Sequence, residues 1–300
     1  MESAHDQLSA SFDPLNGTPP PGSKAPGFLF GVNDNGQYIG GFWNESINTQ
    51  SLFIYKDGTY TVLSNPLTIP GNTINTGIWA SEINDAGKVV GNIFGQVNNI
   101  PVDHGFIYSN NKFVQLDHPS ASTTAVYTIS GPLGDFKVSK TTITGINDIG
   151  QMVGNYVDSS GKSHGFLYSN NIFTTLDNPQ GVGKTTVEDI NNKGQIVGSY
   201  FDASGKGHGF TYSDGQWTTI DDQRGVGTRL TEINDSGFIL GSYIDSNNKL
   251  NPLIYKSGSF GTVPGFENAT GFMGSGLNDK GQLVGSYYTG DPAKGTAVFH

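Results

Sequence analysis

Three histidines at equivalent places in the chain are the first candidates for metal binding or acid–base chemistry. His104, His164 and His208 each begin a His-Gly-Phe segment. The ligands of one metal ion lie within about 2.1 Å of it, whereas equivalent positions in stacked sheets lie on the order of 10 Å apart. The three histidines are therefore not expected to share one metal ion.

An aspartate is predicted to face each histidine across a hairpin. Each histidine precedes a two-residue turn, such as Asp214-Gly215, and residues at equal distances from that turn face each other. The carboxylate accepts a hydrogen bond from the imidazole and fixes its tautomer. A His–Asp dyad is also part of a hydrolytic triad, but three near-identical dyads favour structural latches, since an enzyme needs one. The predicted latch pairs are His104–Asp117, His164–Asp177 and His208–Asp221.

Three acids form the constellation that most resembles a site. Glu82, Asp189 and Glu232 each stand two residues before the asparagine of a repeated turn, on strands expected to line a central channel. Hydrogen bonds to the backbone of neighbouring blades are their simpler role. A divalent cation with these three acids as metal ligands is the alternative, because it would relieve the repulsion between the carboxylates. No other cofactor is indicated.

Two segments, Asp158–Lys162 and Asp202–Lys206, resemble pieces of calcium loops. They lack the alternating acidic ligands and the final glutamate of an EF-hand. We expect them to be turns closed by the aspartate side chain, with a glycine in the left-handed conformation.

The elements that position these residues come from a repeat. An Asn-Asp-x-Gly turn occurs five times and an Asn-Asn version once, at intervals of 43 to 63 residues. Four antiparallel strands in a repeat of about 44 residues are typical of a β-propeller blade. Around the fourth copy the predicted strands are Thr185–Asn191, Gln195–Phe201, His208–Tyr212 and Gln216–Asp221.

The repeat predicts an all-β fold, a six-bladed β-propeller of four-stranded antiparallel blades, in one domain spanning residues 1–300. Blades are expected to start near residues 27, 78, 141, 185, 228 and 272. The sixth unit has no fourth strand of its own, and residues 7–14 resemble the ends of fourth strands. We expect residues 7–14 to complete the last blade and close the ring, which removes an exposed edge, with residues 15–26 as a Pro/Gly-rich linker.

Composition narrows the functional classes. The 300 residues carry a formal net charge of −10, which argues against binding to nucleic acid or to an anionic membrane. Cysteine is absent, which excludes disulfides and thiolate chemistry. No apolar run is long enough for a membrane span, and a monomer is expected. Residues 1–5 lack the basic and apolar regions of a signal peptide, so a secreted form would have lost its leader.

The loops that join the fourth strand of one blade to the first strand of the next vary most. They are expected on one face of the ring, where variable loops on a rigid scaffold usually carry function. Aromatic side chains with a few polar groups suit sugars or peptides. The predicted ligand-binding residues are Trp79, His118, Tyr127, Lys184, Arg224 and Arg229.

The units resemble the HAF-repeat family, described as probable extracellular repeat proteins. The resemblance is carried by the three His-Gly-Phe segments and by turn segments such as Asn147–Gly154, and it covers nearly the whole chain from Gly27. It implies a secreted or periplasmic protein and names no catalytic residue.

Two functions remain open at this stage. One is a secreted binding module that recognises a carbohydrate, another small molecule or a protein on its loop face. The alternative is a hydrolase, lyase or cyclase at the mouth of the channel, assisted by a cation. The near-symmetric, Gly-rich blades favour the binding module, whereas the uneven loops, above all residues 118–140, allow one asymmetric catalytic pocket.

Overall fold

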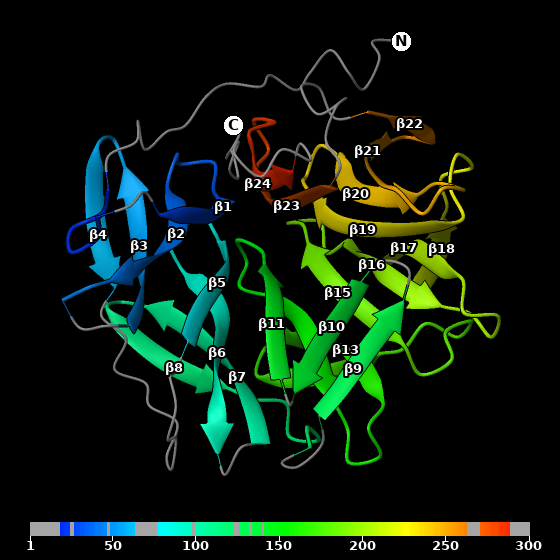
Figure 1. Cartoon of the computed structure of the whole chain (residues 1–300), viewed down its shortest axis with the longest axis horizontal. Coiled ribbons are helices and arrows are strands. Elements are labelled where there is room, and N and C mark those ends of the chain that lie inside the picture. The colour runs from blue at the N-terminus through cyan, green and yellow to red at the C-terminus, as the bar shows by residue number, and fades with distance from the viewer. Residues whose placement is uncertain are drawn as a thin grey trace.

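The computed structural model describes residues 19–24, 27–46, 49–63, 77–97, 100–122, 126–131, 134–139, 141–262 and 271–288. Within these ranges the chain is all β, with antiparallel sheets whose strands pair in sequence order. No helix in this part of the chain is long and apolar enough to cross a membrane. The fold is a β-propeller, as the repeat predicts (Figure 1).

Five blades are complete four-stranded sheets, and each runs from an inner first strand to an outer fourth strand. The first two blades are β1 (Phe28–Val32), β2 (Tyr38–Asn44), β3 (Thr49–Lys56) and β4 (Thr59–Leu63), then β5 (Gly77–Ile83), β6 (Val89–Val97), β7 (Ile100–Ser109) and β8 (Lys112–Leu116). The third is β11 (Thr141–Ile146), β12 (Met152–Val157), β13 (Ser163–Ser169) and β14 (Ile172–Leu176). The fourth is β15 (Thr185–Ile190), β16 (Ile196–Phe201), β17 (Gly207–Ser213) and β18 (Gln216–Ile220). The fifth is β19 (Gly227–Ile233), β20 (Ile239–Ile244), β21 (Leu250–Lys256) and β22 (Ser259–Gly261).

The sixth place in the ring is taken by a two-stranded sheet, β23 (Gly271–Leu277) and β24 (Leu283–Tyr288). The described residues therefore contain five complete blades, where the sequence predicted six. The expected third strand of this unit and the closing strand at residues 7–14 lie outside the described residues. Another difference is a hairpin, β9 (Val126–Gly131) with β10 (Gly134–Ser139), within a segment that the sequence treated as a loop.

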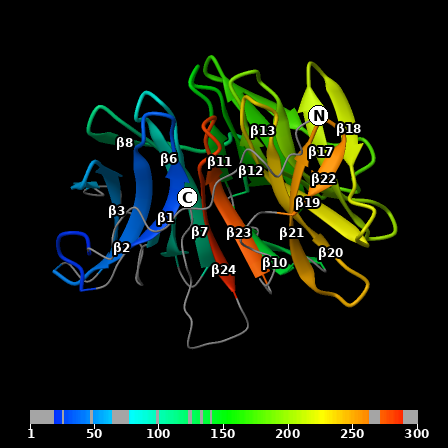
Figure 2. The same cartoon turned by 90° about the horizontal axis from the view of Figure 1, so that it is seen from above.

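The first strands of the six units surround the centre of the ring. Figure 1 shows β1, β5, β11, β15, β19 and β23 around the axis, and each contacts the next. Seen from the side in Figure 2, the strands run between two faces of the ring. One face carries the loops that lead into first strands and into third strands, and we call it the loop face. The other carries the two short turns of each blade, and we call it the turn face.

The hairpin register follows from the turn residues. Both residues of the Asp214-Gly215 turn have positive φ, 50° and 80°, as a type I′ turn requires. The pairing Gly209↔Ile220 then places His208 opposite Asp221, the first residue after β18. The other two His-Gly-Phe hairpins have the corresponding register.

The core lies between blades. Apolar side chains of one blade pack on those of the next, and the phenylalanine of each His-Gly-Phe segment is fully buried. A glycine on the second strand makes room for it. In blade four a Cβ at Gly198 would lie 2.1 Å from the Thr186 carbonyl oxygen and 2.8 Å from the Phe210 ring. Each blade is thus held by its neighbours rather than by a core of its own.

Candidate functional site

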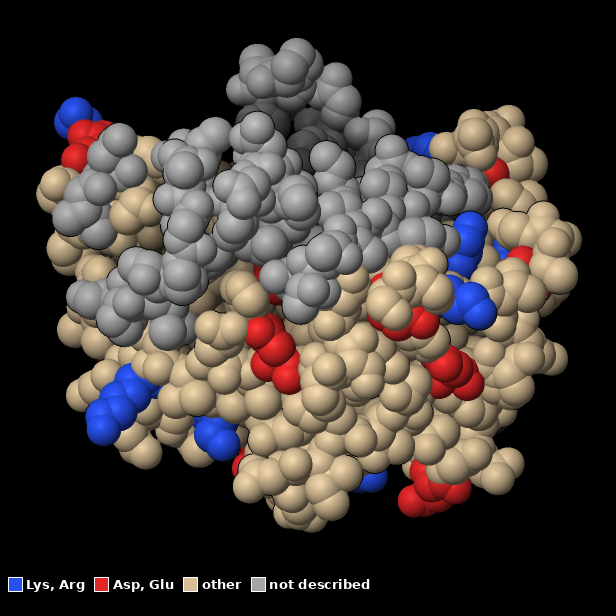
Figure 3. All heavy atoms as spheres, turned by 90° about the horizontal axis from the view of Figure 1, so that it is seen from below, with Lys and Arg blue, Asp and Glu red and all other residues tan. Residues whose placement is uncertain are grey.

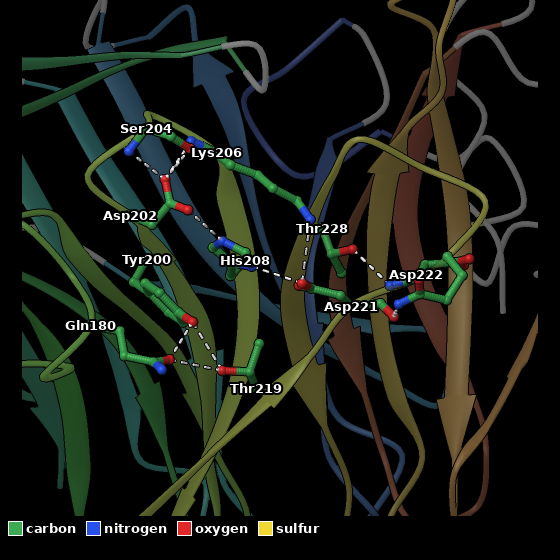
Figure 4. A network of polar contacts seen from close by, with 11 residues as sticks. Gln180, Tyr200, Asp202, Ser204, Lys206, His208, Thr219, Asp221, Asp222 and Thr228 are labelled. Carbon is green, nitrogen blue, oxygen red and sulfur yellow. Dashed lines mark hydrogen bonds and ion pairs between the residues drawn. The ribbon is translucent and has the colours of Figure 1, made fainter.

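The predicted latches are formed, and in two blades the histidine contacts a second carboxylate. His208 Nδ1 lies 2.7 Å from Asp221 and its Nε2 lies 3.2 Å from Asp202, which sits in the turn before β17 (Figure 4). His164 has the same arrangement, with Asp177 at 2.9 Å and Asp158 at 3.3 Å. His104 contacts Asp117 at 2.7 Å, and no turn carboxylate is placed against it in the described structure.

The two calcium-like segments are turns, as expected. Asp158 Oδ1 accepts hydrogen bonds from the Ser160 hydroxyl and from the backbone N–H groups of Ser160 and Lys162. The Ser160 hydroxyl is the main reason that the pKa of Asp158 is held below its ordinary value. In blades three and four the latch therefore joins a loop-face turn to the end of the fourth strand, and the histidine stacks on a tyrosine, as His208 does on Tyr200.

His118 is not presented to a ligand, contrary to the sequence prediction. It is 6% exposed and its ring stacks on Tyr156 at 3.7 Å. Its Nδ1 accepts a hydrogen bond from the Ser120 N–H, just as the side-chain oxygens of Asn178 and Asp222 accept from the residue two positions on. Burial is the main reason that its pKa is lowered to about 4, so the ring is neutral and acts as a loop cap. The sequence contained this information, because Asp117-His118-Pro119 and Asp177-Asn178-Pro179 match and place His118 where the next blade has Asn178.

Two closed cycles of hydrogen bonds run around the turn face. The amide of each repeat asparagine is buried and donates to the backbone carbonyl of the asparagine in the next blade, at 2.9–3.1 Å. The following residue donates its N–H to the next blade's Asp or Asn side chain at 2.6–2.9 Å. The last links run from Asn278 to Asn33 and from Asp279 to Asp34, so the ring closes through its inner strands.

A small cavity of about 60 Å³ opens at the centre of the turn face. Glu82 and the paired residues of the turns line it. The pKa of Asp279 at this cavity is raised to about 6. Burial is the main cause and the charges of Asp235 and Asp34 add to it, whereas a hydrogen bond from the Asp235 N–H acts against it. Most of the residues that line this cavity belong to the two hydrogen-bond cycles, so their role is to close the ring.

The three channel acids come together, and two of them bind backbone. Asp189 is 4% exposed and accepts hydrogen bonds from the N–H groups of Ile190 and Ile233, at 2.6 and 2.8 Å. Glu82 accepts from the Ile146 N–H at 2.6 Å and shares a hydrogen bond with Asp189. A Cβ at the intervening Gly145 would lie 2.7 Å from Asp189 Oδ1, so that glycine permits the contact.

Burial and mutual repulsion change how these acids ionise. Burial, then the charge of Asp189, raises the pKa of Glu82 well above its ordinary value, and the same causes act on Glu232. Burial raises the pKa of Asp189 to about 6, against the effect of its two backbone N–H donors. Among the described residues no three His, Asp or Glu side chains have an arrangement that could hold a metal ion. The hydrogen bonds to the next blade's backbone are the role that the geometry supports.

The loop-face mouth of the channel is built differently. On each inner strand the residue five positions before the repeat asparagine lies toward the loop-face end of the strand, and we call this end of the ring centre the loop-face mouth. Two of these side chains are large and exposed, Phe28 at 56% and Trp79 at 49%. The Trp79 ring is 5.3 Å from that of Phe30 and 6.4 Å from that of Phe94. The six residues at this level are Phe28, Trp79, Thr142, Thr186, Arg229 and Met273.

Arg229 occupies the same level on β19, three blades from Trp79 in a ring of six, and therefore on the opposite side of the channel. Its guanidinium donates through Nε and NH2 to Glu188 Oε1, at 3.1 and 2.7 Å. Both side chains are partly exposed, 22% for Arg229 and 13% for Glu188. Sequence reasoning selected Arg229 but missed Glu188, because the two lie 41 residues apart on neighbouring blades.

The remaining predicted ligand residues lie elsewhere on the loop face. Arg224 forms a tight ion pair with Asp222 and lies 4.7 Å from the Tyr243 ring, so it braces the loop into blade five. The Lys184 ammonium is 5.6 Å from the Phe201 ring. Tyr127 belongs to β9, and its side chain lies outside the described residues.

Exposed apolar side chains favour the loop face. Five of the large exposed ones lie there, on inner strands, at the end of β2 and in the loops that precede β15 and β19. On the side of the molecule seen in Figure 3, Lys and Arg are interspersed with Asp and Glu rather than gathered in one patch. The five apolar residues are Phe28, Trp43, Trp79, Val182 and Val226.

Comparison with known proteins adds the following. No family model matches the chain, and no curated protein matches it. Among solved structures it is similar to the fucose-recognising six-bladed lectin of Aleuria aurantia, at 12% identity and TM-score 0.47, over 91% of this chain and 93% of that one. It is also similar to the β-propeller domain of the Trilobed protease from Pyrococcus furiosus, at 11% identity and TM-score 0.48, over 91% and 92%. We carry no ligand or activity across from these likenesses.

Proposed function

We propose that this protein is a binding module that takes a saccharide at the loop-face mouth of its channel. The observation that carries the proposal is Trp79, an indole that is half exposed near the loop-face end of β5 and lies 5.3 Å from the buried Phe30 ring. An exposed aromatic that is held in place costs energy in water and suits the apolar face of a sugar ring.

The polar groups at the same level complete the proposal. Sugars need hydrogen-bonding partners as well as a platform, and Arg229 with Glu188 supplies a donor and an acceptor across the channel. Among the six residues at the level of Trp79 only one is a tryptophan and only one an arginine, and Glu188 is the only acid three positions before a repeat asparagine, so a ligand would meet one asymmetric site. The secreted location implied by the repeat resemblance goes with this function.

An enzyme receives less support. The channel acids that would serve as acid and base, Glu82 and Asp189, already accept backbone hydrogen bonds from the next blade. The three His–Asp latches are equally engaged, each between two elements of its own blade. The hydrolase, lyase or cyclase alternative therefore stays a prediction.

A glycan array tests the proposal. We expect the purified protein to bind a small group of glycans, and Trp79→Ala to lose that binding while melting within a few degrees of the wild type. Trp217→Phe is the matched control, since Trp217 packs on Phe210 and Tyr212 at the outer edge of blade four. Glycan binding that survives in Trp79→Ala would place the ligand elsewhere.

A further inference from the structure

The Glu188 carboxylate, on β15, can accept more hydrogen bonds than it receives from Arg229. Arg229 donates through Nε and NH2 to the same oxygen of Glu188, Oε1. Within the described residues nothing donates to the other oxygen, Oε2. A carboxylate has about four acceptor positions, so an unused oxygen beside a channel mouth can accept from a ligand hydroxyl.

Acidic groups outnumber basic ones beside Glu188. Glu188 precedes Asp189 in the chain. Burial is the main reason that the pKa of Glu232 is raised, and the charges of Asp189 and Glu188 add to this effect. Arg229 is the nearby cation, and it offsets only part of this effect. An anionic group placed beside Glu188 would be repelled by its carboxylate.

Together these contacts define what the site accepts. We propose that the ligand is an uncharged saccharide, that Glu188 accepts a hydrogen bond from one of its hydroxyl groups, and that the same carboxylate rejects carboxylated and sulfated glycans. The inference rests on the proposed function, because it assumes a saccharide on Trp79. It makes Glu188 a specificity-determining residue, with Arg229 holding its carboxylate in position. Hydrogen bonds from hydroxyl groups to a carboxylate are stronger than those to a neutral acceptor.

The test uses an array that pairs neutral oligosaccharides with their charged counterparts, namely glucose with glucuronate, galactose with galacturonate, and each neutral sugar with its sulfate ester. We expect the wild-type protein to bind neutral members at least about tenfold more tightly than charged ones. Glu188→Gln should weaken neutral binding by roughly tenfold, because a neutral amide replaces the carboxylate acceptor, and should raise binding of the carboxylated partner, because the repelling charge is gone.

A matched control removes a charge from the other face. Asp148→Asn changes the net charge by the same amount as Glu188→Gln, and blade four already carries an asparagine, Asn192, at the equivalent position. It should leave the neutral-over-charged ratio unchanged.

The outcomes separate the two claims. Trp79-dependent binding with no preference for neutral glycans, or Glu188→Gln that binds as the wild type does, would overturn the inference and leave the proposed function standing. Absence of any Trp79-dependent glycan would overturn both. The wild-type array alone measures the charge preference, so the inference is tested even if Glu188→Gln does not fold.

Discussion

The two faces of the ring use the same strands in opposite ways. On the turn face all six units contribute the same asparagine, and its amide links each blade to the next in a closed cycle. Five residues earlier on the same strands, toward the loop face, five residue types occupy the six positions, and they include an aromatic, a hydroxyl and a charged residue. Repetition serves ring closure, which every blade must share, and variation serves a single asymmetric surface.

This contrast predicts that the largest loss of stability comes from the turn face. Asn147→Leu removes two donated hydrogen bonds, to the Asn191 carbonyl and the Gln151 side chain, and leaves the Gln151 N–H without its acceptor. Each buried group left unpaired costs ~1–3 kcal/mol, so a total loss of several kcal/mol is expected in urea unfolding. The loop-face control Thr186→Val should change the free energy of unfolding by less than ~0.5 kcal/mol. Equal losses for the two variants would remove the distinction between the faces.

The latches should come next, and the chain contains its own comparison. His208→Ala breaks contacts to two carboxylates and is expected to lower stability by ~1–3 kcal/mol, since hydrogen bonds to charged groups lie in that range. His104→Ala breaks the contact to one and should cost less. Chemical denaturation of both variants measures the difference. A larger loss for His104→Ala would show that the turn carboxylate Asp202 contributes nothing.

The channel acids predict a smaller effect with the opposite sign. An acid whose pKa is raised on folding stabilises the protein below its unfolded pKa, and this contribution is lost as pH rises through the folded pKa. Glu232→Gln removes one such acid, and in the part of the chain that the structure describes no backbone N–H donates to Glu232 as Ile146 and Ile233 donate to Glu82 and Asp189. At pH 7.5 the variant should be more stable than the wild type, because burial and the charges of Asp189 and Glu188 raise the pKa of Glu232 and disfavour its ionised form.

Unfolding curves at pH 4.5 and pH 7.5 check this sign. At pH 4.5 the difference between Glu232→Gln and the wild type should shrink, because the wild-type carboxyl is then protonated in the folded state. A variant that is less stable at pH 7.5 would mean that Glu232 is held by a favourable contact, such as a cation.

The outcome for individual residues shows what a sequence can specify. The His–Asp opposition was predictable because Asp214-Gly215 sets the hairpin register locally and pairing then follows residue by residue. The shared position of Glu82, Asp189 and Glu232 on inner strands was predictable, but their pairing was not: the sequence placed Asp189 beside Glu232 with Glu82 opposite, whereas Glu82 shares a hydrogen bond with Asp189. Contacts between blades that depend on how far a long side chain extends were not predictable. The Arg229–Glu188 pair falls beside the bulge between Leu230 and Glu232, and no local pattern announces either the bulge or the pair.

The wrong prediction for His118 also shows the value of comparing blades. His118 was predicted as a ligand residue because its loop is long and histidine is often functional. In the structure its Nδ1 accepts a hydrogen bond from the backbone N–H two residues further on, as the Asn178 side chain does in the next blade. The comparison of blades carried this information, whereas the residue type alone did not.

The effect of the loop-face mouth on stability should be the smallest of all. Trp79 is half exposed, so Trp79→Phe keeps an aromatic platform and should shift the free energy of unfolding by less than ~1 kcal/mol. This makes it a clean probe, because a change in ligand response cannot then be a change in folding.

Intrinsic fluorescence tests the central claim most directly. The chain has three tryptophans, of which Trp43 and Trp79 are exposed at the loop face and Trp217 packs in blade four. The best neutral glycan from the array is titrated into the wild type, Trp79→Phe and Trp43→Phe. If the sugar lies on Trp79, the change in emission on binding disappears in Trp79→Phe and persists in Trp43→Phe. A change that persists in Trp79→Phe would contradict binding at the channel mouth.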